Sequence, residues 1–246
     1  MGTSPFVADA GGLPADGGMI RKGQLLRVCG DLVSLEELHG LEAAGVRTYI
    51  DLRGPDEDRM RLMRWARRAR VEYVSIPIGV AGGRDLMRRI LVGGGGAAQV
   101  LALYRAIVDE QGTKLAQAVG AIAGGTPVAF GCAAGKDRTG VLAALIQSAL
   151  AVPDEHIARS YVRSAPPVER FAAALQEEFD VSPWLLRLRG ARALLGAHEP
   201  TILATLAHVR RTHGGAEEYL LAHGLDPATV PALRVRLAKF RVTCQP

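Results

Sequence analysis

The chain has 246 residues, of which 48% are hydrophobic and 22% are charged, and its formal net charge is +5. A chain this apolar is not disordered, and no run approaches the ~18 consecutive apolar residues of a membrane-spanning helix. The basic residues are scattered and aromatic residues make up only 5%, whereas nucleic-acid surfaces combine clustered basic residues with aromatics. We therefore expect a globular protein with no nucleic-acid partner and no stable membrane insertion.

The cysteine pattern gives no sign of a disulfide framework or a metal site. Cys29, Cys132 and Cys244 are odd in number and widely spaced, and none has the neighbours of a zinc ligand. The N-terminus lacks the basic start and apolar stretch of a signal peptide. We expect a cytoplasmic protein that needs no metal and no cofactor, in which each cysteine is either packed in the core or a reactive thiol.

In chain order, residues 1–24 are rich in Gly, Asp and Pro and are expected to form an irregular arm. Short apolar runs predict strands at 24–28, 46–52, 71–77 and 127–130. Helical spacing is predicted at 34–44, 59–70, 98–109, 114–122 and 141–150. The first of these helices begins with Ser34 and has Glu37 three residues later, the pattern of a capping box.

Strands that alternate with helices indicate an α/β fold with a parallel or mixed sheet covered by helices. After residue 140 the chain is predicted to be mostly helical. Residues 164–195 could form a helical lid or pack in the core. No linker divides the sequence, so we expect a single domain over residues 1–246.

One stretch carries the pattern of a phosphate-binding loop. The apolar strand at 127–130 leads into a turn of small residues and then into a helix, and five residues separate Cys132 from Arg138 in this turn. Such a turn can direct successive backbone N–H groups inward and form an anion site, to which the helix dipole contributes. A cysteine at its base is favoured as a thiolate, and an arginine can hold two phosphate oxygens. Gly135 permits the turn, and Thr139 can donate a hydrogen bond to the thiolate.

Two other interpretations of this stretch were weighed. In a nucleotide-binding Walker loop, Ser or Thr would follow the lysine, but Asp137 follows Lys136, and the glycine spacing from Gly131 is one residue too short. An ordinary strand–turn–helix with a buried cysteine is also compatible with a bare Cys-x5-Arg pattern. The complete run Gly-Lys-Asp-Arg-Thr-Gly favours the phosphate loop over both.

The sequence from Cys132 to Gly140 resembles the signature loop of the bacterial tyrosine-phosphatase-like family. The segment starting at Asp9 and the strand 46–53 (Val-Arg-Thr-Tyr-Ile-Asp-Leu-Arg) are similar to two further segments of that family. The resemblance implies a cysteine-phosphatase fold, with a central sheet flanked by helices and the phosphate loop at the end of a strand. It implies a phosphorylated substrate, which could be a protein, a lipid or a small metabolite; the oligomeric state stays open.

The resemblance also implies a two-step hydrolysis of a phosphomonoester. Cys132 would attack phosphorus to give a cysteinyl-phosphate that water then hydrolyses, and Arg138 would hold the phosphate oxygens. Asp137 and Asp51 are candidates for the general acid, although Asp137 could instead pair with an arginine and Asp51 could orient Arg138. The residues expected to bind the substrate are Ala133, Ala134, Gly135, Lys136, Thr139 and Arg53. Lys136 could face the substrate or lie in solvent.

Three departures from the family pattern leave alternatives open. Gly131 stands where the family usually has His, Ala8 precedes Asp9 where the family usually has Arg, and Arg27-Val-Cys29 stands where it generally has Arg-Ser. The missing His would normally orient the loop. The same fold could therefore serve phosphate elimination or rearrangement in a biosynthetic pathway, or act as a phosphate-binding pseudophosphatase.

Overall fold

The computed structural model describes residues 4, 6–15, 18–54, 57–79, 96–166, 168–170, 172–173 and 195–240. A five-stranded central sheet has the order β1-β4-β7-β5-β6. Its strands are β1 (Val7–Asp9), β4 (Leu25–Cys29), β5 (Thr48–Asp51), β6 (Glu72–Ser75) and β7 (Val128–Cys132). Four of them are parallel, and β1 pairs antiparallel with β4 at the edge. The predicted mixed sheet is confirmed.

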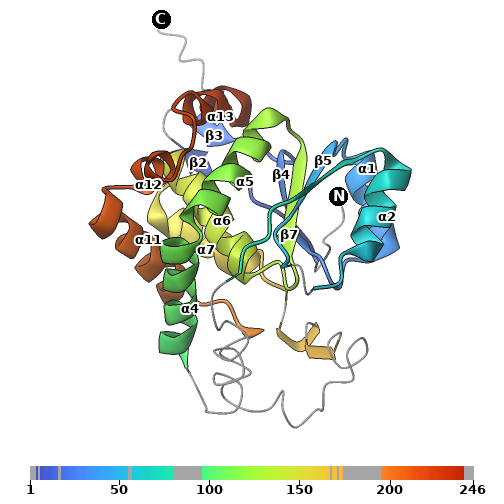
Figure 1. Cartoon of the computed structure of the whole chain (residues 1–246), viewed down its shortest axis with the longest axis horizontal. Helices are drawn as coiled ribbons and strands as arrows, with labels where there is room; N and C mark the ends of the chain where they lie inside the picture. Colours follow the sequence, from blue (N-terminus) through green and yellow to red (C-terminus); the bar gives the residue numbers. More distant parts are fainter. Residues whose placement is uncertain are drawn as a thin grey trace, which may run out of the picture.

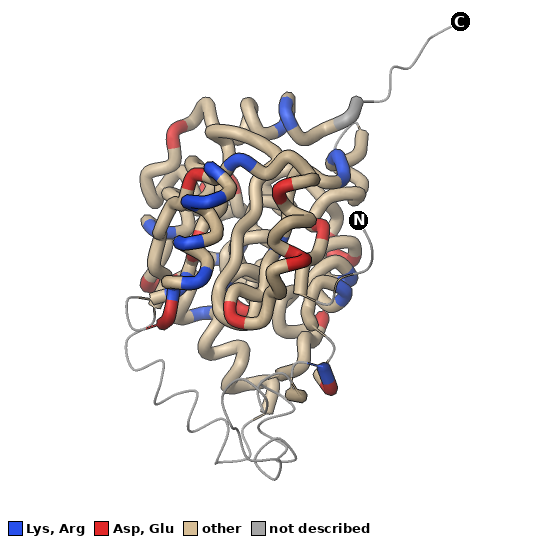
Figure 2. Tube along the Cα trace, turned by 90° about the vertical axis from the view of Figure 1, so that its right-hand side faces the viewer, with Lys and Arg blue, Asp and Glu red and all other residues tan. Residues whose placement is uncertain are grey.

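Helices cover both faces of this sheet (Figure 1). On one face lie α1 (Leu35–Ala43) and α2 (Met60–Ala69). Further helices among the described residues lie on the opposite side: α4 (Ala97–Glu110), α5 (Gly112–Gly124), α6 (Asp137–Ala149), α7 (Asp154–Arg163), α11 (Glu199–His213), α12 (Ala216–Ala222) and α13 (Thr229–Leu237). The α1–α2 side faces the viewer in Figure 2, where basic and acidic positions are interspersed.

Alternation along the strands divides the core between the two faces. Leu26, Val28 and Ala129 belong to the cluster under α1 and α2, together with Trp65. Leu25, Val128 and Phe130, at alternating positions of the same strands, belong to the larger cluster under the other helices. Both faces of the sheet are covered because successive strand residues point to opposite sides, and parallel strands are usually buried on both.

The expectation of an irregular arm at residues 1–24 is wrong for the part that the structure describes. β1 lies in this segment, and so do two strands of a small second sheet, β2 (Pro14–Ala15) and β3 (Gly18–Ile20). That sheet has the order β2-β3-β8, with β8 (Ala238–Phe240) from the end of the chain. The segment is ordered because its backbone pairs with β4 and β8, which are remote in sequence.

Two helix starts can be compared with the predictions. The Ser34–Glu37 capping box of α1 is confirmed, since each side chain accepts a hydrogen bond from the other residue's backbone N–H. The helix predicted from residue 141 instead begins at Asp137. The reason is that Gly135 turns the chain at once into helix, so Arg138 and Thr139 lie in the first helical turn.

Residues 164–195, for which a helical lid and packing in the core were both left open, lie largely outside the described residues. In the described ranges, no helix combines the length and apolarity needed to cross a membrane.

Candidate active site

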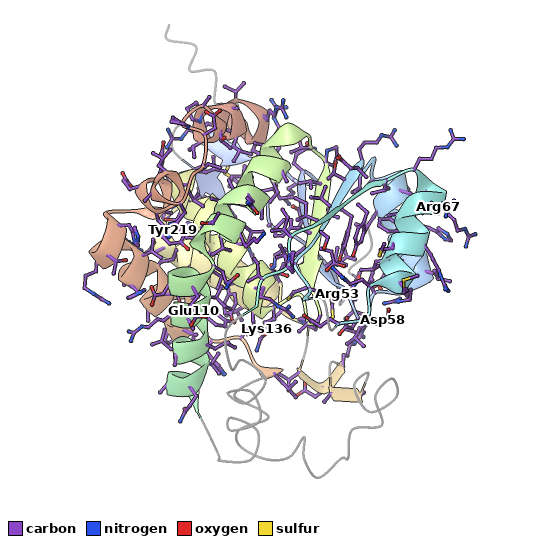
Figure 3. The ribbon with its side chains drawn as sticks, in the orientation of Figure 1. Arg53, Asp58, Arg67, Glu110, Lys136 and Tyr219 are labelled. Carbon is purple, nitrogen blue, oxygen red and sulfur yellow. The ribbon has the colours of Figure 1, made fainter. Side chains whose placement is uncertain are left out.

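The candidate site lies at the carboxyl end of the sheet, where β7 ends at Cys132 and residues 133–136 connect it to α6. Cys132 is buried. Lys136 and Arg53 lie at this same edge of the sheet, reached from different segments of the chain (Figure 3). The structure thus brings together the predicted loop and the end of β5.

The carbonyl groups of Cys132 and Ala133 point toward the segment that follows β4. The Cys132 carbonyl accepts from Gly30 N–H at 2.7 Å, and the Ala133 carbonyl accepts from Asp31 N–H at 3.2 Å. Among the described residues, no hydrogen-bond partner is found for the backbone N–H groups of Ala133, Ala134 and Gly135. The first turn of α6 likewise has no side-chain cap. These donors and the helix dipole make the loop suitable for an anion.

Gly135 is the residue that permits this loop. Its φ is +64°, a region that favours glycine. A Cβ at this position would lie 2.7 Å from the Val28 carbonyl oxygen and 2.8 Å from the Cys29 nitrogen, both on β4. Glycine is therefore required by the backbone angle and by the close approach of β4.

Arg138 is held in place by a carboxylate that the sequence did not reveal. Its Nη1 and Nη2 donate to Glu57 Oε2 and Oε1 at 2.6 and 2.7 Å, the bidentate geometry that suits a planar guanidinium. Burial lowers the pKa of Arg138, but the hydrogen bonds to Glu57 and the nearby Cys132 outweigh burial and raise it. Burial raises the pKa of Glu57, but the hydrogen bond to Arg138 and the charge of Arg138 lower it by more. The pKa of Glu57 therefore lies below its ordinary value.

Asp51 is fully buried at the end of β5 and pairs with Arg53, not with Arg138. Arg53 Nε lies 3.0 Å from Asp51 Oδ1, and Nη2 lies 2.7 Å from Oδ2. Tyr73 Oη donates to the same Oδ2 at 2.5 Å. Arg53 Nη1 also donates to Asp31 at 2.9 Å. Arg53 is itself buried, so Asp51 and Arg53 form a buried ion pair beneath the loop.

Asp137 lies in the first turn of α6 and is partly exposed. Its Oδ1 accepts from Tyr104 Oη at 2.8 Å, and Tyr104 Oη lies 2.5 Å from Tyr161 Oη. Burial, helped by the charge of Asp137, raises the pKa of both tyrosines. The two hydroxyls therefore stay protonated, so Tyr104 remains a hydrogen-bond donor to Asp137.

Lys136 is buried, with 1% of its surface exposed. Its Nζ donates to the Gly196 carbonyl at 3.0 Å and lies 3.3 Å from Asp137 Oδ1. The solvent-exposed alternative for Lys136 is therefore wrong. The Lys136 side chain points inward because its ammonium group interacts with the Gly196 carbonyl and the Asp137 carboxylate. It connects the loop to the segment before α11.

Arg27, on β4, is a further buried charge that sequence reasoning did not assign to the site. Its Nη2 donates to the Gly135 carbonyl at 2.9 Å. Burial lowers its pKa, while Tyr161, Cys132, Tyr104 and Asp137 raise it. The hydrogen bond to the Gly135 carbonyl places the guanidinium against the loop. The sequence feature that could have revealed this residue is an arginine inside the apolar run Leu-Leu-Arg-Val-Cys, because a buried charge needs a partner.

Gly131, which stands in place of the family's histidine, has no room for a side chain. An added Cβ would lie 2.4 Å from the Val28 carbonyl oxygen and 2.8 Å from Tyr49 Oη. Tyr49 is fully buried, and its hydroxyl has no hydrogen-bond partner among the described residues. The aromatic side chain from β5 thus lies where a residue 131 side chain would begin.

The chain is similar to several known proteins. A model of the "Tyrosine phosphatase family" matches residues 7–239. A "Tyrosine-protein phosphatase" of Nostoc commune is 29% identical over 96% of this chain and 85% of its own length. The "Triple specificity protein phosphatase PtpB" of Mycobacterium tuberculosis is 31% identical over 53% of this chain and 51% of its own length. The crystal structure of P. aeruginosa TpbA aligns with 84% of this chain and 99% of its own, at 19% identity and a TM-score of 0.30.

The phosphate loop and the mixed sheet define a cysteine-dependent phosphatase, a hydrolase of the protein-tyrosine-phosphatase type. The family match covers nearly the whole chain, and the chain belongs to the tyrosine phosphatase family. The family favours hydrolysis over the elimination, rearrangement and pseudophosphatase alternatives.

Proposed function

We propose that this phosphatase hydrolyses phosphotyrosine, with Cys132 as the nucleophile. The observation that carries the proposal is the position of Cys132 at the base of a loop in which the N–H groups of residues 133–135 have no hydrogen-bond partner in the described part of the chain. This loop leads into the start of α6, which has no side-chain cap. The thiolate attacks phosphorus as the bond to the leaving oxygen breaks, and water then hydrolyses the cysteinyl-phosphate. The Thr139 hydroxyl, buried and without a described partner, is available to stabilise the departing thiolate.

Arg138 binds the phosphate oxygens, together with the N–H groups of residues 133–135. Phosphoryl transfer depends mainly on such positioning and charge stabilisation. Glu57 pre-orients the guanidinium before substrate enters. Arg53 and Lys136 are buried and already bonded to protein groups. We therefore assign both to support of the loop rather than to direct substrate contact.

Asp137 is the residue we propose as the general acid. It is partly exposed and lies in the first turn after the loop, where a leaving oxygen can approach it. Asp51 has both carboxylate oxygens engaged by Arg53 and Tyr73 and is fully buried. We therefore propose Asp51 as a positioning residue that orients Arg53.

Phosphotyrosine is preferred as substrate because two of the relatives are named as phosphatases of the tyrosine or triple-specificity type.

A cytoplasmic location is supported by the buried free thiols of Cys29 and Cys132, since a reducing compartment preserves thiols.

The nucleophile is tested by phosphate release from a phosphotyrosine peptide and from p-nitrophenyl phosphate, without added metal. We expect Cys132→Ser and Arg138→Ala each to lower kcat/KM by at least about a thousandfold. Cys244→Ser is the matched cysteine control and should keep the parent rate. Activity that survives Cys132→Ser would contradict the assignment. Retained phosphate binding without turnover in the parent protein would favour a pseudophosphatase.

The general acid is tested by comparing leaving groups. Asp137→Asn should lower kcat on phenyl phosphate by about 10²-fold or more, because phenolate is a poor leaving group that needs a proton. The loss on p-nitrophenyl phosphate should be much smaller, because its leaving group departs unprotonated. An equal loss on both substrates would argue that Asp137 supports the loop through Tyr104 and Lys136 and does not supply the proton.

A further inference from the structure

The two carboxylate oxygens of Asp137 have different surroundings. Oδ1 accepts a hydrogen bond from Tyr104 Oη at 2.8 Å and lies 3.3 Å from Lys136 Nζ. In the described part of the chain, no hydrogen bond reaches Oδ2, and this oxygen is not among the buried polar atoms. The Asp137 side chain is 15% exposed. Oδ2 is therefore the oxygen that a substrate can approach.

The direction of the hydrogen bonds among Asp137 and the two tyrosines follows from their protons. Tyr104 has a single hydroxyl proton, and an ionised carboxylate can only accept. Tyr104 therefore donates to Asp137, and in the 2.5 Å contact between the two hydroxyls Tyr161 is the donor. The same order holds when Oδ2 carries a proton, because Oδ1 still accepts.

Packing between three helices fixes the two tyrosine hydroxyls in place. Tyr104 on α4 and Tyr161 on α7 are buried, and their rings meet edge to face with centroids 6.3 Å apart. Gly140 on α6 leaves the space for the second ring, since a Cβ there would lie 2.8 Å from Tyr161 Cε2. Closely packed side chains move little, so the donor to Oδ1 has a fixed position before substrate enters.

We propose that Tyr104 is a positioning residue for the general acid, which together with Lys136 holds Oδ1 of Asp137 and leaves Oδ2 to carry the proton. As Cys132 attacks phosphorus, the bond to the leaving oxygen breaks and the Oδ2 proton moves to that oxygen. The hydroxyl and the ammonium group at Oδ1 stabilise the negative charge left on Asp137. Tyr161 orients Tyr104. The proposal rests on the role of Asp137 under the proposed function.

The charged and titratable groups that face Asp137 come from β4, α4, α6, α7 and the loop. They are Arg27, Tyr104, Arg138, Tyr161 and Lys136. A Tyr-to-Phe substitution leaves all three cations in place and keeps the ring in the core. It therefore removes the hydrogen bond to Oδ1 and little else.

The test compares the parent with Tyr104→Phe, Tyr161→Phe and the matched control Tyr219→Phe. Tyr219 is also buried, and its hydroxyl donates to the Val108 carbonyl at 2.6 Å, away from the loop (Figure 3). For each protein, kcat/KM is measured against pH on phenyl phosphate and on p-nitrophenyl phosphate. Thermal unfolding and vanadate binding show that a variant is folded and that its loop still binds an anion.

We expect Tyr104→Phe to lower kcat/KM by about tenfold on phenyl phosphate but only about twofold on p-nitrophenyl phosphate, whose leaving group needs no proton. On phenyl phosphate, the high-pH side of the profile should move up by about 0.5–1 pH unit, because the carboxylate has lost a donor. Tyr161→Phe should give the same pattern with smaller changes, and Tyr219→Phe should match the parent. In Asp137→Asn protein, Tyr104→Phe should not change the ratio of the two rates further.

An equal loss on both substrates in folded Tyr104→Phe, with the pH profile unmoved, would overturn the proposal, since support of the loop alone predicts that result. If Tyr104→Phe does not fold, the same comparison is made with Tyr161→Phe. The proposed function has its own arm. An equal loss on both substrates in Asp137→Asn would remove Asp137 as the general acid, whereas a leaving-group effect in Asp137→Asn but not in Tyr104→Phe would overturn only the positioning role.

Discussion

Tyr49 and Gly131 show how two residues on neighbouring strands fit each other. Tyr49 places a large side chain on β5, and Gly131 leaves β7 without a side chain directly beside the Tyr49 hydroxyl. The strand before the nucleophile is thus packed by an aromatic ring that comes from the neighbouring strand. A histidine at position 131 would meet the Val28 backbone as well as the ring, so the loop must be supported by other groups, including Arg27.

Glu57→Gln tests whether the carboxylate orients Arg138. We expect kcat/KM to fall by about 10- to 100-fold, because a misplaced catalytic group costs up to roughly 10²-fold. The fall in kcat/KM should appear mainly in kcat, since the phosphate can still bind the loop N–H groups. Glu36→Gln, an exposed carboxylate on α1, is the matched control and should leave the rate unchanged. An unchanged rate in Glu57→Gln would show that Arg138 is oriented without it.

The same variant tests the pH dependence of stability. The pKa of Glu57 is lowered from its ordinary value of 4.5 by Arg138. A carboxylate whose pKa is lower in the folded state adds stability above 4.5, and this is lost as pH falls through the folded value. Urea unfolding should therefore find the parent more stable than Glu57→Gln at pH 7, with the difference shrinking in acid. A difference independent of pH would contradict the ion pair.

At the scale of elements, the site depends on the junction of β4, β7 and α6. β4 supplies Arg27 and Cys29 beneath the loop, and the residues after it donate to the loop carbonyls. The helix begins at Asp137 and brings Arg138 and Thr139 into its first turn. Because neighbouring parallel strands end at the same edge of the sheet, these groups from distant segments lie close together.

Gly135→Ala tests this junction. An alanine at this position would have to keep an unfavourable positive φ, and its Cβ would lie within 3 Å of three backbone atoms of β4. We expect roughly 1–3 kcal/mol of lost stability and loss of vanadate binding, because the N–H groups would no longer converge. Urea unfolding and vanadate titration measure the two effects. Gly124→Ala, at a helix end with nothing near the added Cβ, is the control.

At the scale of the whole molecule, segments that are far apart in the sequence, residues 18–20 and 238–240, pair in the small sheet. β3 pairs with β8 from Gly18↔Phe240 to Ile20↔Ala238, and Arg21 N–H donates to the Leu237 carbonyl at 2.7 Å. This sheet lies at the opposite end of the molecule from the carboxyl edge of β7 (Figure 1). The small sheet therefore stabilises the fold and supplies no residue to the candidate site.

Truncation after Leu237 removes β8 and tests this separation. We expect the free energy of unfolding to fall by roughly 1–3 kcal/mol, as a few backbone hydrogen bonds are lost, and Tm to fall with it. The kcat on p-nitrophenyl phosphate at 25 °C should stay within about twofold of the parent, since stability and activity separate when the affected element is remote. A large loss of kcat in protein that is still folded would show that the small sheet is coupled to the loop.

The amino-acid sequence by itself determined the α/β class, the capping box of α1 and the phosphate loop. Periodicity, capping and turn residues are local, so Ser34, Glu37 and the run from Cys132 to Gly140 reveal them without knowledge of neighbours. The extent of α6 was misjudged because Gly135 turns the chain into helix sooner than the apolar pattern begins.

Only the tertiary structure decided which side chains meet. Glu57 has no sequence relation to Arg138, Cys29 is about a hundred residues from Cys132, and Asp51 pairs with Arg53 rather than with Arg138. These contacts depend on strand order and register, which bring distant segments to one edge of the sheet. The burial of Lys136 and the missing space at Gly131 have the same origin, because close packing between elements is a property of the assembled fold.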